Sequence, residues 1–307
     1  MNRAAGFVTS LAAVAALAGC GSADGEDNTD GDSRRGLIDR VPAESAELDS
    51  VALLDAIAMR EALDLPEDAG YERDFSDPAS AEVFFAEVLG SALPHLNGPV
   101  ETPMSAALDT QQIAAVASTF AVFAPESVTV VVTEQPFEQI APELAAQGYR
   151  QQGEALVSNQ PQSRIAYPAV ASGDGFIAMG GSAEAVLTAA EGSGEAPPSA
   201  ARELIDGSEA PFVAARTYGA DDCVEAVGAS VSGKGSSELL LLVEDGASAE
   251  RFSLASDPLG LGYEFGEPEV DGERLTVAVD PEDSGLIGPP LGLITGDLGS
   301  SLYDCRA

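Results

Sequence analysis

Hydrophobic residues along this chain follow two spacings, which together predict both strands and helices. Residues 128–133 read Val-Thr-Val-Val-Val-Thr, a β-branched run that favours a strand. In residues 77–93, apolar side chains instead recur every three or four positions. An Asp-Pro pair opens this second segment and suits the N-cap and first position of a helix. The pattern therefore predicts a mixed fold rather than a helical bundle.

The same two spacings continue along the chain and are interrupted by glycine and proline. The predicted strands cover residues 51–55, 116–123, 128–133, 165–172, 176–180, 212–216, 227–231, 238–243, 263–270 and 274–279. The predicted helices cover residues 55–63, 77–93, 136–146 and 182–190, and a further helix begins near residue 247. Asp271-Gly272, between two alternating runs, predicts a hairpin with a type I′ turn.

One segment breaks this pattern near the middle of the chain. Residues 192–199 read GSGEAPPS and are the best candidate for a boundary. Residues 41–191 and residues 199–307, on its two sides, show a similar order of strands, hairpins and helices. We therefore expect an α+β fold built on antiparallel sheets with helices on one face, in two halves that resemble a duplicated unit.

The N-terminus has a different character from the rest. After Arg3, residues 4–17 carry no charge and are almost wholly apolar. This run is too short to span a bilayer and suits the apolar region of an export signal. It ends in Leu-Ala-Gly-Cys20, which resembles the lipobox of bacterial lipoprotein signal peptides.

This resemblance implies that residues 1–19 are a removed signal peptide and that Cys20 carries a diacylglyceryl group, with an acyl chain such as palmitate on the new amino group. Two or three chains, at about 0.8 kcal/mol per buried methylene, anchor a protein stably. Residues 20–40, rich in Asp and Gly, then read as a flexible acidic tether. The expected location is the extracytoplasmic face of the cell membrane. The globular part is similar only in general character to envelope lipoproteins of high-GC bacteria.

The strongly negative net charge of the chain restricts which molecules it can bind. The chain has 51 acidic and 14 basic residues, for a formal net charge of −37. Such a surface repels nucleic acid and anionic headgroups, so contact with the membrane must come through the lipid on Cys20. Solubility accounts for this acidity better than capture of cations does.

Two cysteines remain after Cys20, namely Cys223 and Cys305. In an exported protein, two such residues are expected to pair as a disulfide. The bridge would join the end of the chain to the middle of its second half. The alternative is that both are buried free thiols.

The motif that comes nearest to a catalytic signature is Gly228–Gly235, which mimics a phosphate loop. Position 235 is Gly where a hydroxyl is needed, and an apolar strand-like run follows where a helix should. A hairpin turn explains the segment better, so no nucleotide is expected. His95 is the only histidine and suits the end of a helix, and zinc sites need more His or Cys ligands than the chain has.

We therefore predict no catalytic residue, no cofactor and no metal site. The expected function is a non-enzymatic binding or scaffolding role in the envelope, with another envelope protein or the cell wall as partner. Because carboxylates are abundant, a carboxylate-dependent extracytoplasmic hydrolase is one alternative. A cation-binding acidic surface protein is the other.

Overall fold

A computed structural model of the chain describes residues 36–41, 50–65, 84, 88–93, 102–120, 125–160, 167–192, 199–217, 224–233, 236–243 and 263–281. The predictions for Cys20, Cys223 and Cys305 lie outside these residues, as do His95 and the helix expected near residue 247. Of the predicted helix 77–93, only residues 84 and 88–93 are described.

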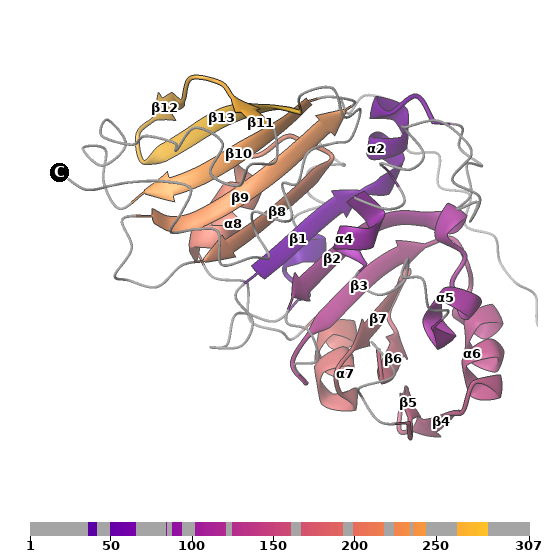
Figure 1. Ribbon diagram of the computed structural model, residues 1–307. Coiled ribbons are helices and arrows are strands. Elements are labelled where there is room, and N and C mark those ends of the chain that lie inside the picture. The colour runs from indigo at the N-terminus through magenta and orange to yellow at the C-terminus, as the bar shows by residue number, and fades with distance from the viewer. Residues whose placement is uncertain are drawn as a thin grey trace, which may run out of the picture.

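One antiparallel sheet forms the centre of the fold. Its described strands number thirteen, in the order β11-β13-β10-β9-β8-β1-β2-β3-β7-β6-β5-β4, with β12 also paired to β13. Figure 1 shows the sheet extending from β4 and β5 at one end to β12 at the other. Their bounds are β1 Ser50–Asp55, β2 Ile113–Phe120, β3 Val128–Thr133, β4 Tyr149–Gln152, β5 Ala155–Ser158, β6 Ala169–Ser172, β7 Phe176–Gly180, β8 Phe212–Thr217, β9 Val224–Gly233, β10 Ser236–Val243, β11 Tyr263–Phe265, β12 Glu269–Asp271 and β13 Arg274–Pro281.

The strand order repeats on the two sides of a central pair, β1 and β8. On one side, β1, β2 and β3 follow in sequence, and β3 then pairs with β7, the second strand of a later hairpin. On the other side, β8, β9 and β10 follow in sequence, and β10 then pairs with β13, again the second strand of a hairpin. The repetition is the arrangement that a duplicated unit produces. Because β1 pairs with β8, both halves share one sheet across residues 192–199.

The helices lie in the segments between these strands. Their bounds are α2 Ala56–Ala62, α4 Gly90–Ala92, α5 Pro103–Ala107, the 3₁₀ helix η2 Thr110–Gln112, α6 Phe137–Ala146, α7 Ala183–Glu191 and α8 Ser199–Asp206. Asp55 ends β1 and caps α2, since its Oδ1 accepts from the Ala58 amide at 2.9 Å. Ser182 caps α7 in the same way, and Gly192 closes that helix with φ 71°.

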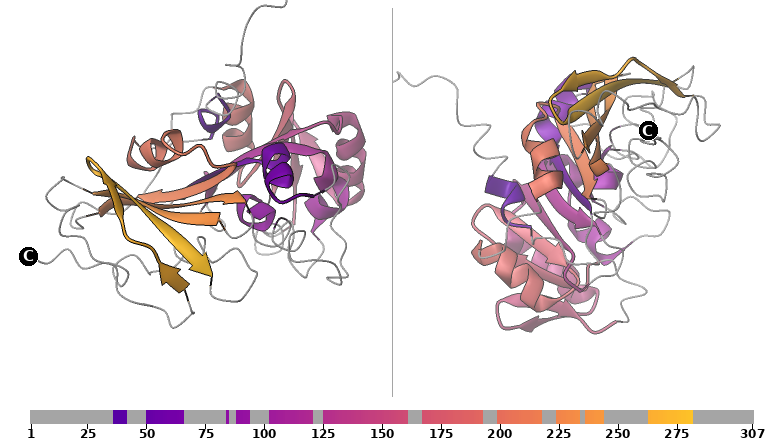
Figure 2. Two further views of the ribbon diagram at one scale, coloured as in Figure 1. Left: turned by 90° about the horizontal axis from the view of Figure 1, so that it is seen from above. Right: turned by 90° about the vertical axis from the view of Figure 1, so that its left-hand side faces the viewer.

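The α+β class with an antiparallel sheet is confirmed, but the helices cover both faces of the sheet rather than one. Ala52 and Leu54 of β1 belong to a core with α2, residues 88–93, α5 and α6. Val51 and Leu53 belong to a second core with α7, α8 and residues 36–41. Figure 2 shows helices on opposite sides of the sheet. The cause is visible in the central strands, where continuous apolar runs such as residues 51–54 require burial on both faces.

The expected tether, residues 20–40, is too long at its C-terminal end. Residues 36–38 form a helical turn, and Ile38 is fully buried. Leu37 and Val41 join it in the core against α7 and α8. Residues 36–41 therefore belong to the folded body rather than to a flexible tether.

Several elements and one turn differ from the sequence prediction. The β4–β5 hairpin, α5, η2 and α8 are additional, and none of them has a long periodic apolar run. The hairpin at residues 271–274 is confirmed, with Asp271 paired to Arg274. Only Gly272 in this turn has positive φ, whereas a type I′ turn needs two such residues, so the predicted turn type is wrong. Within the described ranges, no helix combines the length and apolar character needed to cross a membrane.

Candidate ligand-binding site

A polar hollow of about 470 Å³ opens where the loop after α8 meets the sheet. Small-molecule sites commonly have about 300–1,000 Å³. The loop forms one wall, and side chains of β9, β10 and β13 form the floor. The lining residues are Gly207, Ser208, Glu209, Ala210, Pro211, Ser232, Glu238, Leu240, Arg274 and Thr276.

Strand register brings the floor together. Leu240 of β10 lies opposite Thr276 of β13, and Glu238 lies two positions before Leu240 on the same face. Leu240 packs in the core that also contains Leu204 of α8, so this floor faces α8. The floor therefore combines the apolar side chain of Leu240 with hydroxyl, carboxylate and guanidinium groups.

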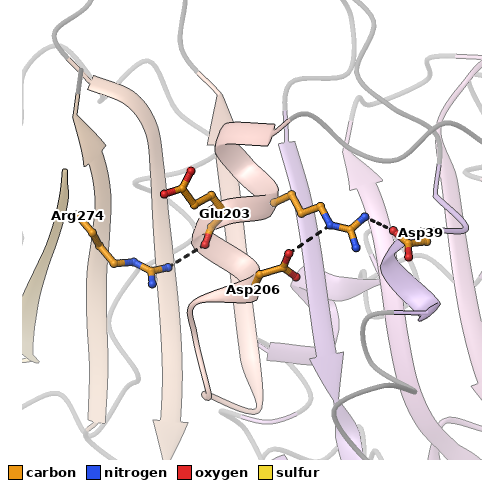
Figure 3. A network of polar contacts seen from close by, with 5 residues as sticks. Asp39, Glu203, Asp206 and Arg274 are labelled. Atoms are coloured by element: carbon orange, nitrogen blue, oxygen red, sulfur yellow. Dashed lines mark hydrogen bonds and ion pairs between the residues drawn. The ribbon is translucent and has the colours of Figure 1, made fainter. Parts of the chain in front are cut away.

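Arg274 joins the floor to the helix above it. Its Nη2 donates to the carbonyl oxygens of Glu203 at 3.0 Å and Leu204 at 2.8 Å. Figure 3 shows Arg274 reaching from its strand toward Glu203 on α8. A guanidinium at this place satisfies carbonyl groups near the C-terminal end of the helix and complements the negative end of its dipole. Arg274 thereby fixes the last turn of α8 over the sheet.

Hydrogen bonds hold the wall formed by residues 207–211. The Ser208 amide donates to the carbonyl of Ile205 at 3.1 Å, and the Ala210 amide donates to Oγ of Ser208 at 3.3 Å. At the end of the loop, the Asp55 amide donates to the carbonyl of Pro211 at 2.7 Å. The wall is thus fixed both to α8 and to the central strand β1.

Glu238 is the carboxylate on the floor. It is half-buried, and its Oε2 accepts a hydrogen bond from Oγ of Ser230 at 3.2 Å. Ser230 is its cross-strand partner on β9 and is fully buried. This neutral donor orients the carboxylate but does not neutralise its charge.

A separate polar network fixes α8 to the first described residues of the chain. Arg202 forms ion pairs with Asp39 and, at 3.3 Å, with Asp206. The hydrogen bond to Asp39 raises the pKa of the Arg202 guanidinium above its ordinary value. Figure 3 shows Asp39 and Asp206 approaching the same side chain from two directions. The network lies at the surface and supports the position of α8 without lining the hollow.

Arg60, which does not line the hollow, has a structural role. It is only 5% exposed, and its guanidinium donates to the carbonyls of Ile113 and Thr110, both at 2.9 Å. The same group lies 4.8 Å from the centroid of the Phe84 ring. Burial lowers the pKa of Arg60, and the charge of Asp109 opposes that shift. Arg60 therefore ties α2 to the start of β2.

The segment that mimics a phosphate loop is strand as far as it is described. Residues 228–233 belong to β9, so the strand continues two residues beyond the predicted range 227–231. A Cβ at Gly228 would lie 3.1 Å from the Ala214 carbonyl oxygen, so this glycine permits close approach of two strands. In the part of the chain that the structure describes, no three His, Cys, Asp or Glu side chains form a group able to hold a metal ion.

The residues of the hollow were not identifiable from the sequence. Glu209, Glu238 and Arg274 lie far apart along the chain, in three elements that only the sheet register brings together. The one local signal was Glu238, a carboxylate that precedes five consecutive apolar residues of a strand. By contrast, Cys20, Cys223 and Cys305, which the sequence singled out, lie outside the described residues.

Neither a protein-family model nor a curated protein sequence matches this chain. Solved structures of TP0453 are similar to it. Crystal form III has a TM-score of 0.45 and 10% identity, covering 81% of this chain and 95% of that chain. Crystal form I has a TM-score of 0.41 and 12% identity, covering 80% of this chain and 91% of that chain.

Proposed function

We propose that this protein is a lipid-anchored component of the cell envelope whose folded body binds a ligand or partner without catalysing a reaction. The lipobox that ends at Cys20 supports the anchor. The hollow beside α8 is the observation that supports the binding role, because it combines a suitable volume with polar groups held by the surrounding fold. The lipid is the link to the membrane.

The position of the first described residues limits how far the hollow can lie from the predicted anchor. Asp39 pairs with Arg202 of α8, and Glu203 and Leu204 of the same helix accept from Arg274 at the hollow. Residues 20–35 can extend at most about 55 Å. We therefore expect the ligand to be a molecule found near the membrane surface.

Cell fractionation tests the anchor. The natural chain should sediment with membranes, and Cys20→Ser should release it to the soluble fraction, because an acidic body has no affinity of its own for anionic lipid. Asn28→Ser changes a residue of the predicted tether outside the lipobox and should leave the protein in the membrane fraction. Membrane retention of Cys20→Ser would contradict the anchor.

Site-specific photo-crosslinking in intact cells tests the binding role. A photoreactive side chain at Ser232, an exposed residue at the edge of the hollow, can reach a bound molecule without filling the site, whereas one at Arg150 lies on the exposed strand β4 at the other end of the sheet. We expect a discrete adduct from position 232 that position 150 does not give. Identical patterns from both positions would contradict a binding role for the hollow.

The hydrolase alternative has one observation in its favour, since Glu209 and Glu238 line the same hollow. Paired carboxylates are the minimum that such chemistry needs. If a hydrolytic activity is found in the purified protein and both Glu209→Gln and Glu238→Gln abolish it, the hydrolase replaces the binding role.

A further inference from the structure

The geometry points to an organic amine as the ligand of the hollow. This inference rests on the proposed binding role and names the chemical class of the molecule bound. Three observations support it: the charges around the hollow, the position of the Arg274 guanidinium, and the volume of the hollow.

Two carboxylates face the hollow from different elements. Glu238 lies on the floor, and Glu209 lies on the loop wall. The C-terminal end of α8 leads directly into that wall at Gly207, and the Arg274 guanidinium already complements the negative end of its dipole. Arg274 is the only cationic side chain among the lining residues.

Arg274 shows how the hollow receives a cation. Its guanidinium donates to the carbonyls of Glu203 and Leu204 and therefore occupies the end of the hollow nearest α8. Glu238 lies opposite Ala278, four positions along β13 from Arg274, which places the two backbones about 13 Å apart along the strands. Glu238 and Arg274 thus lie well apart along the strands that form the floor of the hollow.

The Glu238 carboxylate is left with a neutral donor. Its Oε2 accepts from Ser230, and within the described ranges no ion pair involves it. A half-buried carboxylate that is hydrogen-bonded on one oxygen gains most from a cation that donates hydrogen bonds to the other. An ammonium group supplies both the charge and the donors.

Size and lining favour an organic cation over a metal ion. A volume of about 470 Å³ is far larger than one ion needs. The described residues also provide no group of three carboxylate, His or Cys ligands. The hydroxyls of Ser208, Ser232 and Thr276 can bond to polar groups on a ligand, and Leu240 provides apolar contact for its carbon skeleton.

Three probes of one length separate the possibilities. We would measure binding of 1,5-diaminopentane, 1,5-pentanediol and glutarate to the full lipidated protein in detergent, by calorimetry at physiological salt. We expect saturable binding of one diamine per chain and weaker binding of the diol and the dianion. Glu238→Gln should lower the diamine affinity about tenfold or more, because it removes the charge that the ammonium faces.

Two further variants give the controls. Thr276→Tyr fills the hollow from its floor and should abolish binding, provided that its unfolding transition matches that of the natural chain. Glu269→Gln removes one exposed charge from β12, outside the hollow, and should leave the affinity unchanged. Equal losses of diamine affinity in Glu238→Gln and Glu269→Gln would mean that the affinity depends on net charge alone. The inference would then be overturned.

The remaining outcomes separate this inference from the proposed function. If glutarate or the diol binds better than the diamine and Thr276→Tyr blocks it, the binding role stands and the assignment to amines is wrong. If no probe binds, the assignment to amines is also wrong, and the crosslinking comparison between positions 232 and 150 decides the binding role separately.

Discussion

The guanidinium of Arg274 occupies the space in which a side chain at Gly207 would have to lie. Gly207 follows the last residue of α8, and Arg274 crosses it to reach the carbonyls of Glu203 and Leu204. The absence of a Cβ at position 207 is thus what allows the strand β13 to hold the end of the helix. The same contact sets one end of the hollow.

Gly207→Ala should therefore displace Arg274 and destabilise the protein by about 1–2 kcal/mol, the value of hydrogen bonds from a partly exposed cation to carbonyl groups. Urea unfolding measures the change. In an Arg274→Ala background, the same substitution should change the unfolding free energy by less than about 0.5 kcal/mol, because the group that it displaces is gone. Gly36→Ala, where a Cβ meets nothing within 4 Å, is the control. Additive effects of the two substitutions would contradict the contact.

Arg60→Ala should destabilise the fold much more than a substitution at a surface arginine. It leaves the carbonyls of Ile113 and Thr110 without their donor and removes the contact with Phe84, so we expect a loss of about 2–4 kcal/mol in urea unfolding. Arg202→Ala breaks only partly exposed ion pairs and should cost less than about 1 kcal/mol, with an effect that salt reduces. A larger loss at position 202 than at position 60 would contradict this assignment of roles.

Stability should fall at alkaline pH because of two buried phenols. Burial raises the pKa of Tyr149 and of Tyr167, and the Tyr149 hydroxyl donates to the Tyr167 carbonyl at 2.6 Å. The folded protein therefore holds these protons more tightly than the unfolded chain, whose phenols titrate near pH 10. This contribution is fully present below about pH 10 and is lost as the pH rises further.

Tyr149→Phe tests this directly. Above about pH 10 it should reduce the slope of unfolding free energy against pH by up to about 1.4 kcal/mol per pH unit, because one fewer proton is linked to folding. At pH 7 the variant should lose only the hydrogen bond, about 1 kcal/mol. Equal slopes in the variant and the natural chain would show that Tyr149 ionises without unfolding.

Cys223 and Cys305 are predicted to form a disulfide. Thiol labelling of the unfolded Cys20→Ser variant should find no free thiol until reductant is added. Reduction should lower the free energy of unfolding by up to about 4.5 kcal/mol, since the bridge closes a loop of roughly 83 residues. Two free thiols without reductant would contradict the bridge.

Local signals in the sequence were sufficient for the elements that have strong caps and periodic apolar runs. Asp55 begins α2, and Ser182 begins α7, where the sequence places them. The β4–β5 hairpin was missed because β4 has only Tyr149 buried and reads as a polar segment. A short amphipathic helix such as α8, directly after a proline-rich stretch, offers too few apolar positions for its period to be seen.

Features that depend on pairing between distant strands could not be predicted. The pairing of β1 with β8, which joins the two halves, leaves no mark in either strand beyond an apolar run. That run did indicate burial, but whether helices cover one face or both depends on which elements pack against each strand. The hollow depends on the register of β10 with β13, and Arg274 gained its role only through that register.

Mass spectrometry of the N-terminal peptide from membrane-purified protein shows whether Cys20 carries the lipid anchor. We expect a mature chain that begins at Cys20, with a mass increased by a diacylglyceryl group and, where the amino group is acylated, by one further acyl chain. A peptide that retains residues 1–19, or one that begins at an unmodified Cys20, would contradict it.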